Sequence, residues 1–359
     1  MTSTHPPTQP DWAALVDRIR QWGRELGFQD VGVTDTQLEE HGRHLERWLE
    51  DGLNADLDYM AKHGTKRYRP QELLPGTQRI IAVRMDYRPG DDAPKERLGE
   101  QDKAYVSRYT LGRDYHKLMR KRLAHLAKRI DGELQGHHYR AFVDSAPVLE
   151  RAIANKAGLG WIGKNTMLIS RKAGSFFFLG EIFTDAPLPV DPGHDTEHCG
   201  SCSACLDICP TDAFVGPYRL DAAKCISYLT IENKGAIPEE LRKPMGNRVF
   251  GCDDCQLVCP WNKFSQPTAE PDFQPRHGLD NSELARLFLW DEATFLKKTE
   301  GSAIRRAGFE GWLRNLAVAL GNAPSTINVI EALKARRDHP SELVREHVHW
   351  ALEQHGING

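Results

Sequence analysis

The eight cysteines of this 359-residue chain fall within one stretch, and their spacing suits the binding of iron and sulfide. The first half follows the pattern C-x-x-C-x-x-C-x-x-x-C-P, from Cys199 to Pro210. The second half begins at Cys225 and ends in C-x-x-C-x-x-x-C-P, from Cys252 to Pro260. Two intervening residues let a tight turn present successive sulfurs to one cluster, and the last cysteine of such a run reaches the neighbouring cluster. The spacing therefore predicts two adjacent 4Fe–4S clusters.

The crossover rule of bacterial ferredoxins divides the thiolates into two sets. One cluster is expected on Cys199, Cys202, Cys205 and Cys259, and the other on Cys209, Cys225, Cys252 and Cys255. Two structural zinc sites are the alternative, because C-x-x-C pairs also bind zinc. Disulfides would need an oxidising compartment, which nothing in the sequence indicates. His194 and His198 are expected to be loop residues, since the thiolates already suffice.

Asp144 is a second candidate for chemistry. It follows the strand-like run 140–143 and precedes Ser145-Ala-Pro147, which is typical of a helix start. Its carboxylate can cap that helix, or it can act as a general acid at a strand–helix junction with a pKa raised by burial. The residues alone leave both interpretations open.

The segment from Gly158 to Lys164 imitates two nucleotide-binding motifs. It fits G-x-G-x-x-G and nearly fits the phosphate-binding loop. Both motifs need a preceding strand and a following helix, whereas here the order is reversed. Asn165 also replaces the Ser or Thr that would bind magnesium. We therefore expect Gly158 to end a helix, and the loop to bind neither NAD nor ATP.

Composition and periodicity indicate the elements that position these residues. The chain is 40% apolar with a net charge of −3, and its length suits two or three domains. No apolar run is long enough to span a membrane, no signal peptide is recognisable, and a cytoplasmic location is expected. Helical patterns cover 12–26, 44–63, 114–130 and 147–157, and strand patterns cover 31–33, 79–83, 140–144, 166–170 and 176–183. Their alternation predicts an α/β or α+β fold.

The predicted domains follow these patterns. Residues 1–10 form a disordered lead, 11–190 the α/β domain, 191–275 a ferredoxin-like two-cluster domain, and 276–359 a helical domain. Similar helical patterns at 310–321 and 342–353 suggest HEAT-like repeats. Basic residues gather between 103 and 140 and in the doublets Lys297-Lys298, Arg305-Arg306 and Arg336-Arg337. They are either solvated surface or contacts for phosphates.

Several stretches together resemble one family. They are RYRP at 67–70, ELLPG at 72–76, SRYTLGRDYH at 107–116, VDSAPVLER at 143–151, GWIGKN at 160–165 and CISYLT at 225–230. The combination resembles epoxyqueuosine reductase over nearly the whole chain. The resemblance implies reduction of epoxyqueuosine to queuosine at the wobble position of tRNA, with two 4Fe–4S clusters and cobalamin as cofactors. It also implies that the α/β part is a nitroreductase-like cobalamin domain and that the helical repeats help hold tRNA.

The resemblance assigns roles to individual residues. Asp144 becomes the proton donor, and the expected cobalamin contacts are Arg67, Ser107, Tyr109, Asp144, Lys164, Asn165 and Ser227. The expected partners are the modified tRNA and an external low-potential donor, ferredoxin- or flavodoxin-like; we expect a monomer. Two alternatives are a corrinoid iron–sulfur reductase of small molecules, such as a reductive dehalogenase, and a non-enzymatic electron-transfer subunit.

Overall fold

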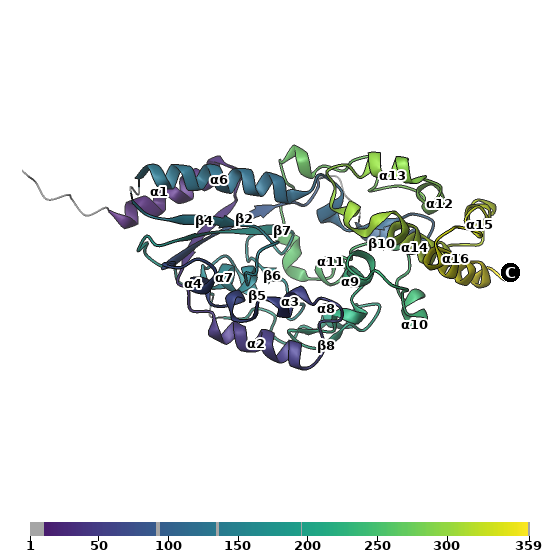
Figure 1. Ribbon diagram of the computed structural model, residues 1–359, viewed down its shortest axis with the longest axis horizontal. Coiled ribbons are helices and arrows are strands. Elements are labelled where there is room, and N and C mark those ends of the chain that lie inside the picture. Colours follow the sequence, from purple (N-terminus) through teal and green to yellow (C-terminus); the bar gives the residue numbers. More distant parts are fainter. Residues whose placement is uncertain (1–10, 91–93, 134–135, 195, 358–359) are drawn as a thin grey trace, which may run out of the picture.

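The computed structural model describes residues 11–90, 94–133, 136–194 and 196–357, and the expected disordered lead lies outside them. A sheet with helices on both sides occupies one end of an elongated molecule (Figure 1). The last helices occupy the other end, and the cysteine-rich segment lies between them. This arrangement places the cysteines where the two ends of the molecule meet.

The central sheet has four strands in the order β1 (Asp30–Thr34), β2 (Arg79–Asp86), β7 (Phe177–Thr184) and β4 (Tyr139–Phe142). Every neighbouring pair is antiparallel. Side chains alternate between the faces, so Ile81 and Val83 enter one core while Ile80 and Ala82 enter another. The strands expected at 31–33, 79–83, 140–144 and 176–183 are thus present, and their antiparallel pairing makes the fold α+β.

Helices cover both faces of this sheet (Figure 1). On one side lie α1 (Trp12–Glu25) and α6 (Tyr115–Glu133), whose apolar residues share a core with Ile81 and Val83. The side chain of Asp11 accepts a hydrogen bond from the Ala14 amide and caps α1, as expected. On the other side lies α7 (Glu150–Lys156). The sheet is buried on both faces, and this rigid layer carries the loop that follows β4.

Three expected boundaries are wrong. The helix expected over 44–63 is instead α2 (Glu39–Glu50), followed by turns with Gly52 at a φ of +65°, α3 (Tyr59–Lys62), η1 (Gly64–Arg67) and α4 (Pro70–Leu73). The helix expected from Pro147 begins at Glu150. The strand expected over 166–170 shrinks to the hairpin of β5 (Trp161–Ile162) and β6 (Leu168–Ile169). In each case a loop interrupts an apolar pattern that periodicity alone extends too far.

The glycine loop behaves as expected. Gly158 follows the end of α7 with a φ of +78°, which a residue with a Cβ rarely adopts. At Gly160 a Cβ would lie 2.3 Å from the carbonyl oxygen of Ile169. The glycines therefore allow a helix end and a close hairpin.

The cysteine-rich segment consists of short elements. They are α8 (Ala204–Asp207), β8 (Phe214–Gly216), β9 (Arg219–Leu220), η3 (Ala222–Lys224), α9 (Ile226–Ile231), α10 (Glu239–Arg242), β10 (Arg248–Phe250), α11 (Asp254–Leu257) and η4 (Pro260–Phe264). The two helices of the C-x-x-x-C-P runs, α8 and α11, pack against each other. This packing brings the two halves of the cysteine pattern together.

An earlier segment joins the C-terminal core. It comprises α5 (Pro94–Gly99), β3 (Tyr105–Val106) and η2 (Arg108–Thr110), and β3 pairs in parallel with β10. Ala104, Val106 and Leu111 share a core with Phe250 and Trp312. Packing therefore crosses the boundary expected at residue 190 and fixes the sheet to the rest of the chain.

The C-terminal part is helical, as expected. It contains η5 (Pro271–Phe273), α12 (Leu284–Phe288), α13 (Glu292–Lys298), η6 (Ala303–Ala307), α14 (Gly308–Gly321), α15 (Ile327–Lys334) and α16 (Glu342–Gln354). Helices α14 and α16 pack closely, because Gly321 leaves room for Trp350, whose ring would lie 2.5 Å from a Cβ there. In the described part of the chain, no helix is long and apolar enough to cross a membrane.

Asn315 links α14 to the cysteine-rich segment. Its side-chain amide donates hydrogen bonds of 2.9 Å to the carbonyls of Thr230 and Val249, and its oxygen accepts from Arg314. Asn315→Leu should lower the free energy of unfolding by about 1–3 kcal/mol, because it leaves buried carbonyls unpaired. Chemical denaturation measures this change. The exposed Asn281→Leu is the control, and equal stabilities of the two variants would contradict the assignment.

Candidate active site

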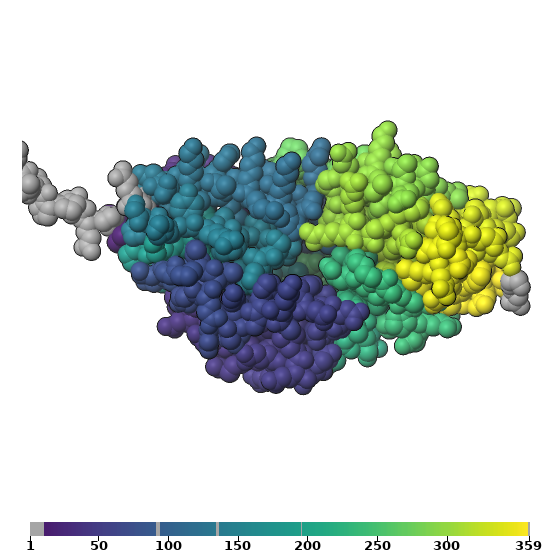
Figure 2. All heavy atoms as spheres, in the orientation of Figure 1, coloured from purple at the N-terminus to yellow at the C-terminus, as the bar shows by residue number. Residues whose placement is uncertain are grey.

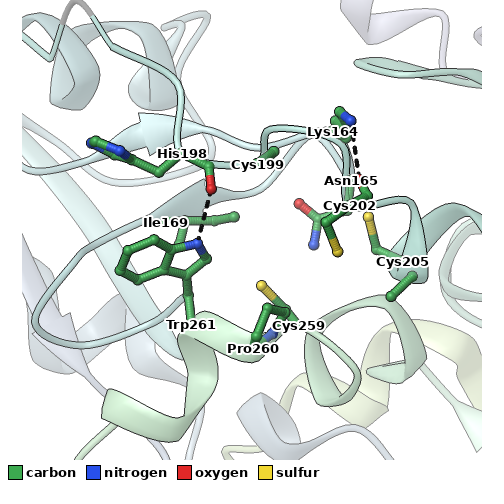
Figure 3. Close-up of a pocket in the computed structure, with 11 residues that line it drawn as sticks. Lys164, Asn165, Ile169, His198, Cys199, Cys202, Cys205, Cys259, Pro260 and Trp261 are labelled. Carbon is green, nitrogen blue, oxygen red and sulfur yellow. Dashed lines mark hydrogen bonds between the residues drawn. The ribbon is translucent and has the colours of Figure 1, made fainter.

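Four cysteines line one pocket between the hairpin loop and the cysteine-rich segment. They are Cys199, Cys202, Cys205 and Cys259, the set that the crossover rule groups together. Figure 3 shows them around a common space, with Lys164 and Asn165 on one side and Trp261 on the other. His198 also lines the pocket, and its carbonyl accepts a hydrogen bond from the Trp261 indole at 3.3 Å.

The other four cysteines lie beside this pocket and deeper in the protein. Burial raises the pKa of Cys255, and the charges of Cys225, Cys205 and Cys209 raise it further, so these thiols are close neighbours. Cys202 is the exposed member of the eight, and none of them is in a disulfide. The chain thus presents two adjacent groups of free thiols, one near the surface and one inside.

A buried carboxylate braces the inner group. Asp253 is 1% exposed and accepts hydrogen bonds from the Tyr105 hydroxyl (2.8 Å), the Ser107 hydroxyl (2.6 Å) and the Arg108 amide (2.9 Å). These donors belong to β3 and η2, far away in the sequence. Because a buried charge without partners is costly, the three bonds fix the Cys252–Cys255 turn against that segment.

Six polar residues from different segments lie close enough to influence one another's charge, and we call the region between them the central space. They are Tyr59 in α3, Arg67 in η1, Tyr109 in η2, Asp144 after β4, Glu232 after α9 and Arg306 in η6. Burial raises the pKa of Tyr59 and of Tyr109, and the charges of Asp144 and Glu232 raise both further. Figure 2 shows a recess where the N-terminal half, the cysteine-rich segment and the early C-terminal helices meet. The charge of Asp253 also raises the pKa of Tyr109, so Tyr109 lies near the inner cysteine turn that contains Asp253.

Asp144 stands in this space on a strained loop. Its φ is +50°, a left-handed conformation that Asp tolerates better than most residues. Its amide donates to the Glu150 carboxylate at 2.6 Å, and its own carboxylate lies 2.8 Å from Nε2 of His116. The side chain is 44% exposed. Because α7 begins only at Glu150, Asp144 is not the helix N-cap that one interpretation of the sequence predicted.

His116 connects Asp144 to further charges. Its Nδ1 lies 2.6 Å from the carboxylate of Asp114, and its ring stacks on Tyr115. Each ring nitrogen faces a carboxylate oxygen, so a doubly protonated ring can donate to both. Arg306 approaches from η6, with Nη2 3.1 Å from His116 Nε2 and 4.0 Å from Asp114.

The electrostatics reverse one expectation about Asp144. Burial raises its pKa, but the hydrogen bond from His116 and the charges of His116 and Arg306 outweigh burial, so the pKa lies below the ordinary value. Burial lowers the pKa of His116, yet the hydrogen bonds to Asp114 and Asp144 raise it above the ordinary value. The raised carboxyl pKa expected from the sequence is therefore wrong. Both directions favour a proton on His116 over a proton on Asp144.

A second carboxylate pair lies below the Asp144 loop. Glu181 is fully buried on β7 and faces Glu150, which holds the Asp144 amide. Burial raises the pKa of both carboxyls, and neighbouring carboxylate charges add to this effect. Two buried carboxyls can hydrogen-bond to each other only when one is protonated. Glu150 holds the loop from the sheet side through the Asp144 amide.

The expected cofactor contacts fall into two groups. Arg67 and Tyr109 border the central space, and Arg67 donates to the Met60 carbonyl at 2.9 Å. The others contact the cysteine-rich segment: Ser107 bonds Asp253, Lys164 donates to the carbonyls of Gly200 and Cys202, Asn165 donates to that of Cys255, and Ser227 bonds Cys225. Their role towards a cofactor stays a prediction.

The basic residues that could contact phosphates fall into two groups, those paired with acidic side chains and those that are exposed. Within 103–140, Arg113 and Arg129 pair with acids, and Arg122 pairs with Glu270. Lys117 and Lys128 are exposed on α6. In the Arg305-Arg306 doublet both side chains are exposed, and Arg306 also reaches His116.

The sequence interpretation missed His116, Asp114, Asp253 and Arg306 as parts of the site. The first two lie within the quoted run 107–116, so their position was visible although their role was not. Asp253 follows a ligand-type cysteine directly, which is a weak signal. Arg306 had only its charge, and nothing in the sequence points it inward.

The His116 pKa gives a test that is independent of turnover. Because the folded pKa is raised, the ion pair stabilises the protein fully below the ordinary histidine pKa and is lost as pH rises through the folded value. Asp144→Asn should lower the His116 pKa in an NMR titration, with His116→Gln identifying the signal. Asp185→Asn, which removes the partner of His137 at 2.9 Å, is the control. An unchanged His116 pKa in Asp144→Asn would refute the pairing.

Comparisons with known proteins place these features in a family. Residues 198–262 match the family model of a 4Fe–4S double cluster binding domain, and residues 67–145 match that of epoxyqueuosine reductase QueG. The first match decides between clusters and zinc for the cysteine pattern. It covers all eight cysteines.

Relatives match along almost the whole chain. An epoxyqueuosine reductase of Pseudomonas aeruginosa is 70% identical over 97% of this chain and 96% of its own length. A solved epoxyqueuosine reductase with an epoxyqueuosine-modified tRNA-Tyr stem loop is 28% identical, with a TM-score of 0.85 over 96% of this chain and 91% of that one. A Bacillus subtilis epoxyqueuosine reductase, whose catalytic aspartate loop is swung out of the active site, has the same identity and coverage and a TM-score of 0.84. The chain therefore belongs to the epoxyqueuosine reductase family.

Proposed function

We propose that this protein reduces the epoxide of epoxyqueuosine in tRNA to the alkene of queuosine. The observation that carries the proposal is the pair of free thiol groups beside a space that contains a His116–Asp144 ion pair. Removing the epoxide oxygen as water consumes two electrons and two protons. The thiol groups supply a place for electron carriers, and the ion pair supplies a proton.

The donor chemistry fits two 4Fe–4S clusters. Four free thiols line the outer pocket, and soft thiolates are the ligands that such clusters use. We assign Cys199, Cys202, Cys205 and Cys259 to the outer cluster, and Cys209, Cys225, Cys252 and Cys255 to the inner cluster. Tyr109 and Asp253 separate the inner set from the central space, so an electron travels from the surface inward.

We assign the central space to cobalamin. It is open, lies beside the inner thiols and is bordered by tyrosines and charged side chains. When bound, cobalamin supplies the low-valent metal that reduces the epoxide. Arg67 and Tyr109 border that space, whereas Ser107, Lys164, Asn165 and Ser227 are proposed as contacts from the family resemblance alone, since their bonds are to the cysteine-rich segment.

Asp144 and His116 act on the proton. The carboxylate faces the open space, and the proton is held on His116 against it. Asp144 can therefore relay the proton from His116 to the departing oxygen. The B. subtilis relative has a catalytic aspartate on a movable loop, and Asp144 stands on a loop with a left-handed backbone, which supports this role.

The remaining parts receive corresponding roles. We take the sheet layer as a nitroreductase-like cobalamin domain and the α14–α16 pair as HEAT-like repeats that help hold tRNA. An external low-potential carrier supplies electrons to a monomer in the cytoplasm, where thiolate-bound iron is stable. Family membership favours this activity over a reductive-dehalogenase-like reductase and over a non-enzymatic electron-transfer subunit.

Double variants test the crossover assignment. Anaerobically purified wild type should contain about eight irons per chain. Cys209→Ser with Cys255→Ser should retain about half of them, because both changes damage one cluster. Cys209→Ser with Cys202→Ser should lose nearly all. Iron analysis measures the content of each variant. If instead the variant with Cys202→Ser kept about half of the iron and the variant with Cys255→Ser lost nearly all, Cys209 would belong to the outer cluster.

Asp144→Asn tests the proton donor in a turnover assay with epoxyqueuosine-containing tRNA. We expect normal iron content and tRNA binding, with turnover slower by about 10²–10⁴-fold, the weight of a lost acid–base group. Asp185→Asn, which removes another histidine-paired carboxylate, should leave turnover unchanged. Near-normal turnover of Asp144→Asn would exclude Asp144 as the donor.

A further inference from the structure

The outer cysteine pocket has one side that reaches the surface. Cys202 is exposed, whereas its partners in the pocket are half-buried. Tunnelling between redox centres falls steeply with distance, so an external electron enters most rapidly at the centre nearest to solvent. If the clusters are assembled as the proposed function requires, the Cys202 edge is the entry point for electrons.

Positively charged side chains lie at the walls of this pocket. Lys164 bonds the carbonyls of Gly200 and Cys202, and Arg171 reaches Nε2 of His198 at 3.1 Å. The His198 ring contacts Trp261, which contacts Phe264, and the Lys263 ammonium lies 4.8 Å from the Phe264 ring. These contacts place Arg171 and Lys263 next to the pocket wall that His198 and Trp261 form; Figure 3 shows that wall.

The positive charges on this surface are available to a partner. Arg171, Lys172 and Lys263 are exposed, and in the described part of the chain none of them forms an ion pair. The carboxylates of Glu197 and Asp207 are also nearby; they accept hydrogen bonds from the hydroxyls of Tyr218 and Ser203 and keep their negative charges. The cations Lys164, Arg171, Lys172 and Lys263 outnumber these two carboxylates.

Apolar side chains accompany the charges. Phe264 is 38% exposed beside Lys263, and Ile208 is 46% exposed in the loop between Cys205 and Cys209. Charged residues around a small apolar contact are typical of transient interfaces, in which charge steers the encounter and the contact area stays small. Surface charge alone does not require a partner, but here it borders the wall of the outer cysteine pocket.

We propose that this surface, the donor patch of Arg171, Lys172, Cys202, Lys263 and Phe264, docks an acidic one-electron carrier protein of low potential. The inference rests on the proposed function, for which it names the route of electron entry. Each encounter transfers one electron from the reduced carrier to the outer cluster. Two encounters supply the two electrons that, with two protons, convert the epoxide to an alkene and water. The patch uses no residue of α12–α16, so carrier and tRNA can bind together.

Stopped-flow reduction of the cluster-loaded full chain by photoreduced flavodoxin, an acidic carrier, tests the patch. Arg171→Glu with Lys263→Glu should lower the second-order rate of cluster bleaching about 10-fold or more at low salt, because attraction becomes repulsion. The difference should shrink as salt rises. Arg24→Glu with Lys95→Glu carries the same charge change on exposed residues of α1 and α5 and should behave as wild type.

Reduction by dithionite separates this inference from the proposed function. Dithionite should reduce both variants and support their turnover equally. If dithionite did not support turnover by the wild type, that result would instead refute the proposed function. If the Glu variant loses iron, Arg171→Gln with Lys263→Gln replaces it, with a smaller expected fall. The proposal would be overturned if flavodoxin reduced all variants at equal rates, or if the variants lost tRNA affinity while their reduction rates stayed unchanged. It would also be overturned if neither flavodoxin nor an acidic ferredoxin reduced the wild type.

Discussion

The buried carboxylate of Asp253 is the interaction on which the geometry of the site depends. A charge at this depth is stable only when donors surround it, and its three donors all come from the segment 105–108. That requirement fixes the inner cysteine turn against η2 and leaves Tyr109 between Asp253 and the central space. The parallel pairing of β3 with β10 holds the same two segments through backbone hydrogen bonds. The inner cysteine turn therefore lies next to Tyr109, because Asp253 in that turn binds donors from the distant segment 105–108.

The pair of His116 and Asp144 determines whether a proton is available at the recess. A lone carboxyl in an open recess would be ionised near neutral pH and would carry no proton to donate. Pairing with His116 lowers the Asp144 pKa further but stores a proton one hydrogen bond away. Asp114 keeps the ring oriented, and Glu150 holds the Asp144 backbone from the other side. In the proposed function the acid is thus a pair of residues, with Asp144 as the exposed end.

The C-terminal helices contribute to the chemistry as well as to packing. Arg306 reaches from η6 to His116, so the helical part completes the charge balance of the proton pair. Arg314 and Asn315 on α14 bond the backbone around α9 and β10, which flank the inner cysteines. A ligand that shifts η6 would therefore act on His116 directly.

The sequence by itself predicted the four cysteines that line one pocket, the strands of the sheet, the last helices and the helix end at Gly158. These features depend on local spacing, on alternation of apolar residues, or on a backbone conformation that only glycine adopts easily. The resemblance of several short stretches added the family. The sequence indicated Asp144 as a candidate for chemistry, but it did not indicate that His116, Asp114 and Arg306 lie beside it.

Only the tertiary structure decided which charges meet. His116, Asp253 and Arg306 gain their roles from contacts over many residues of sequence, and no periodic pattern records such contacts. The start of α7 at Glu150, rather than near Pro147, turned Asp144 from a helix cap into a site residue. The sign of its pKa shift followed from His116, because a partner's charge can outweigh burial and the partner is visible only once the chain is folded.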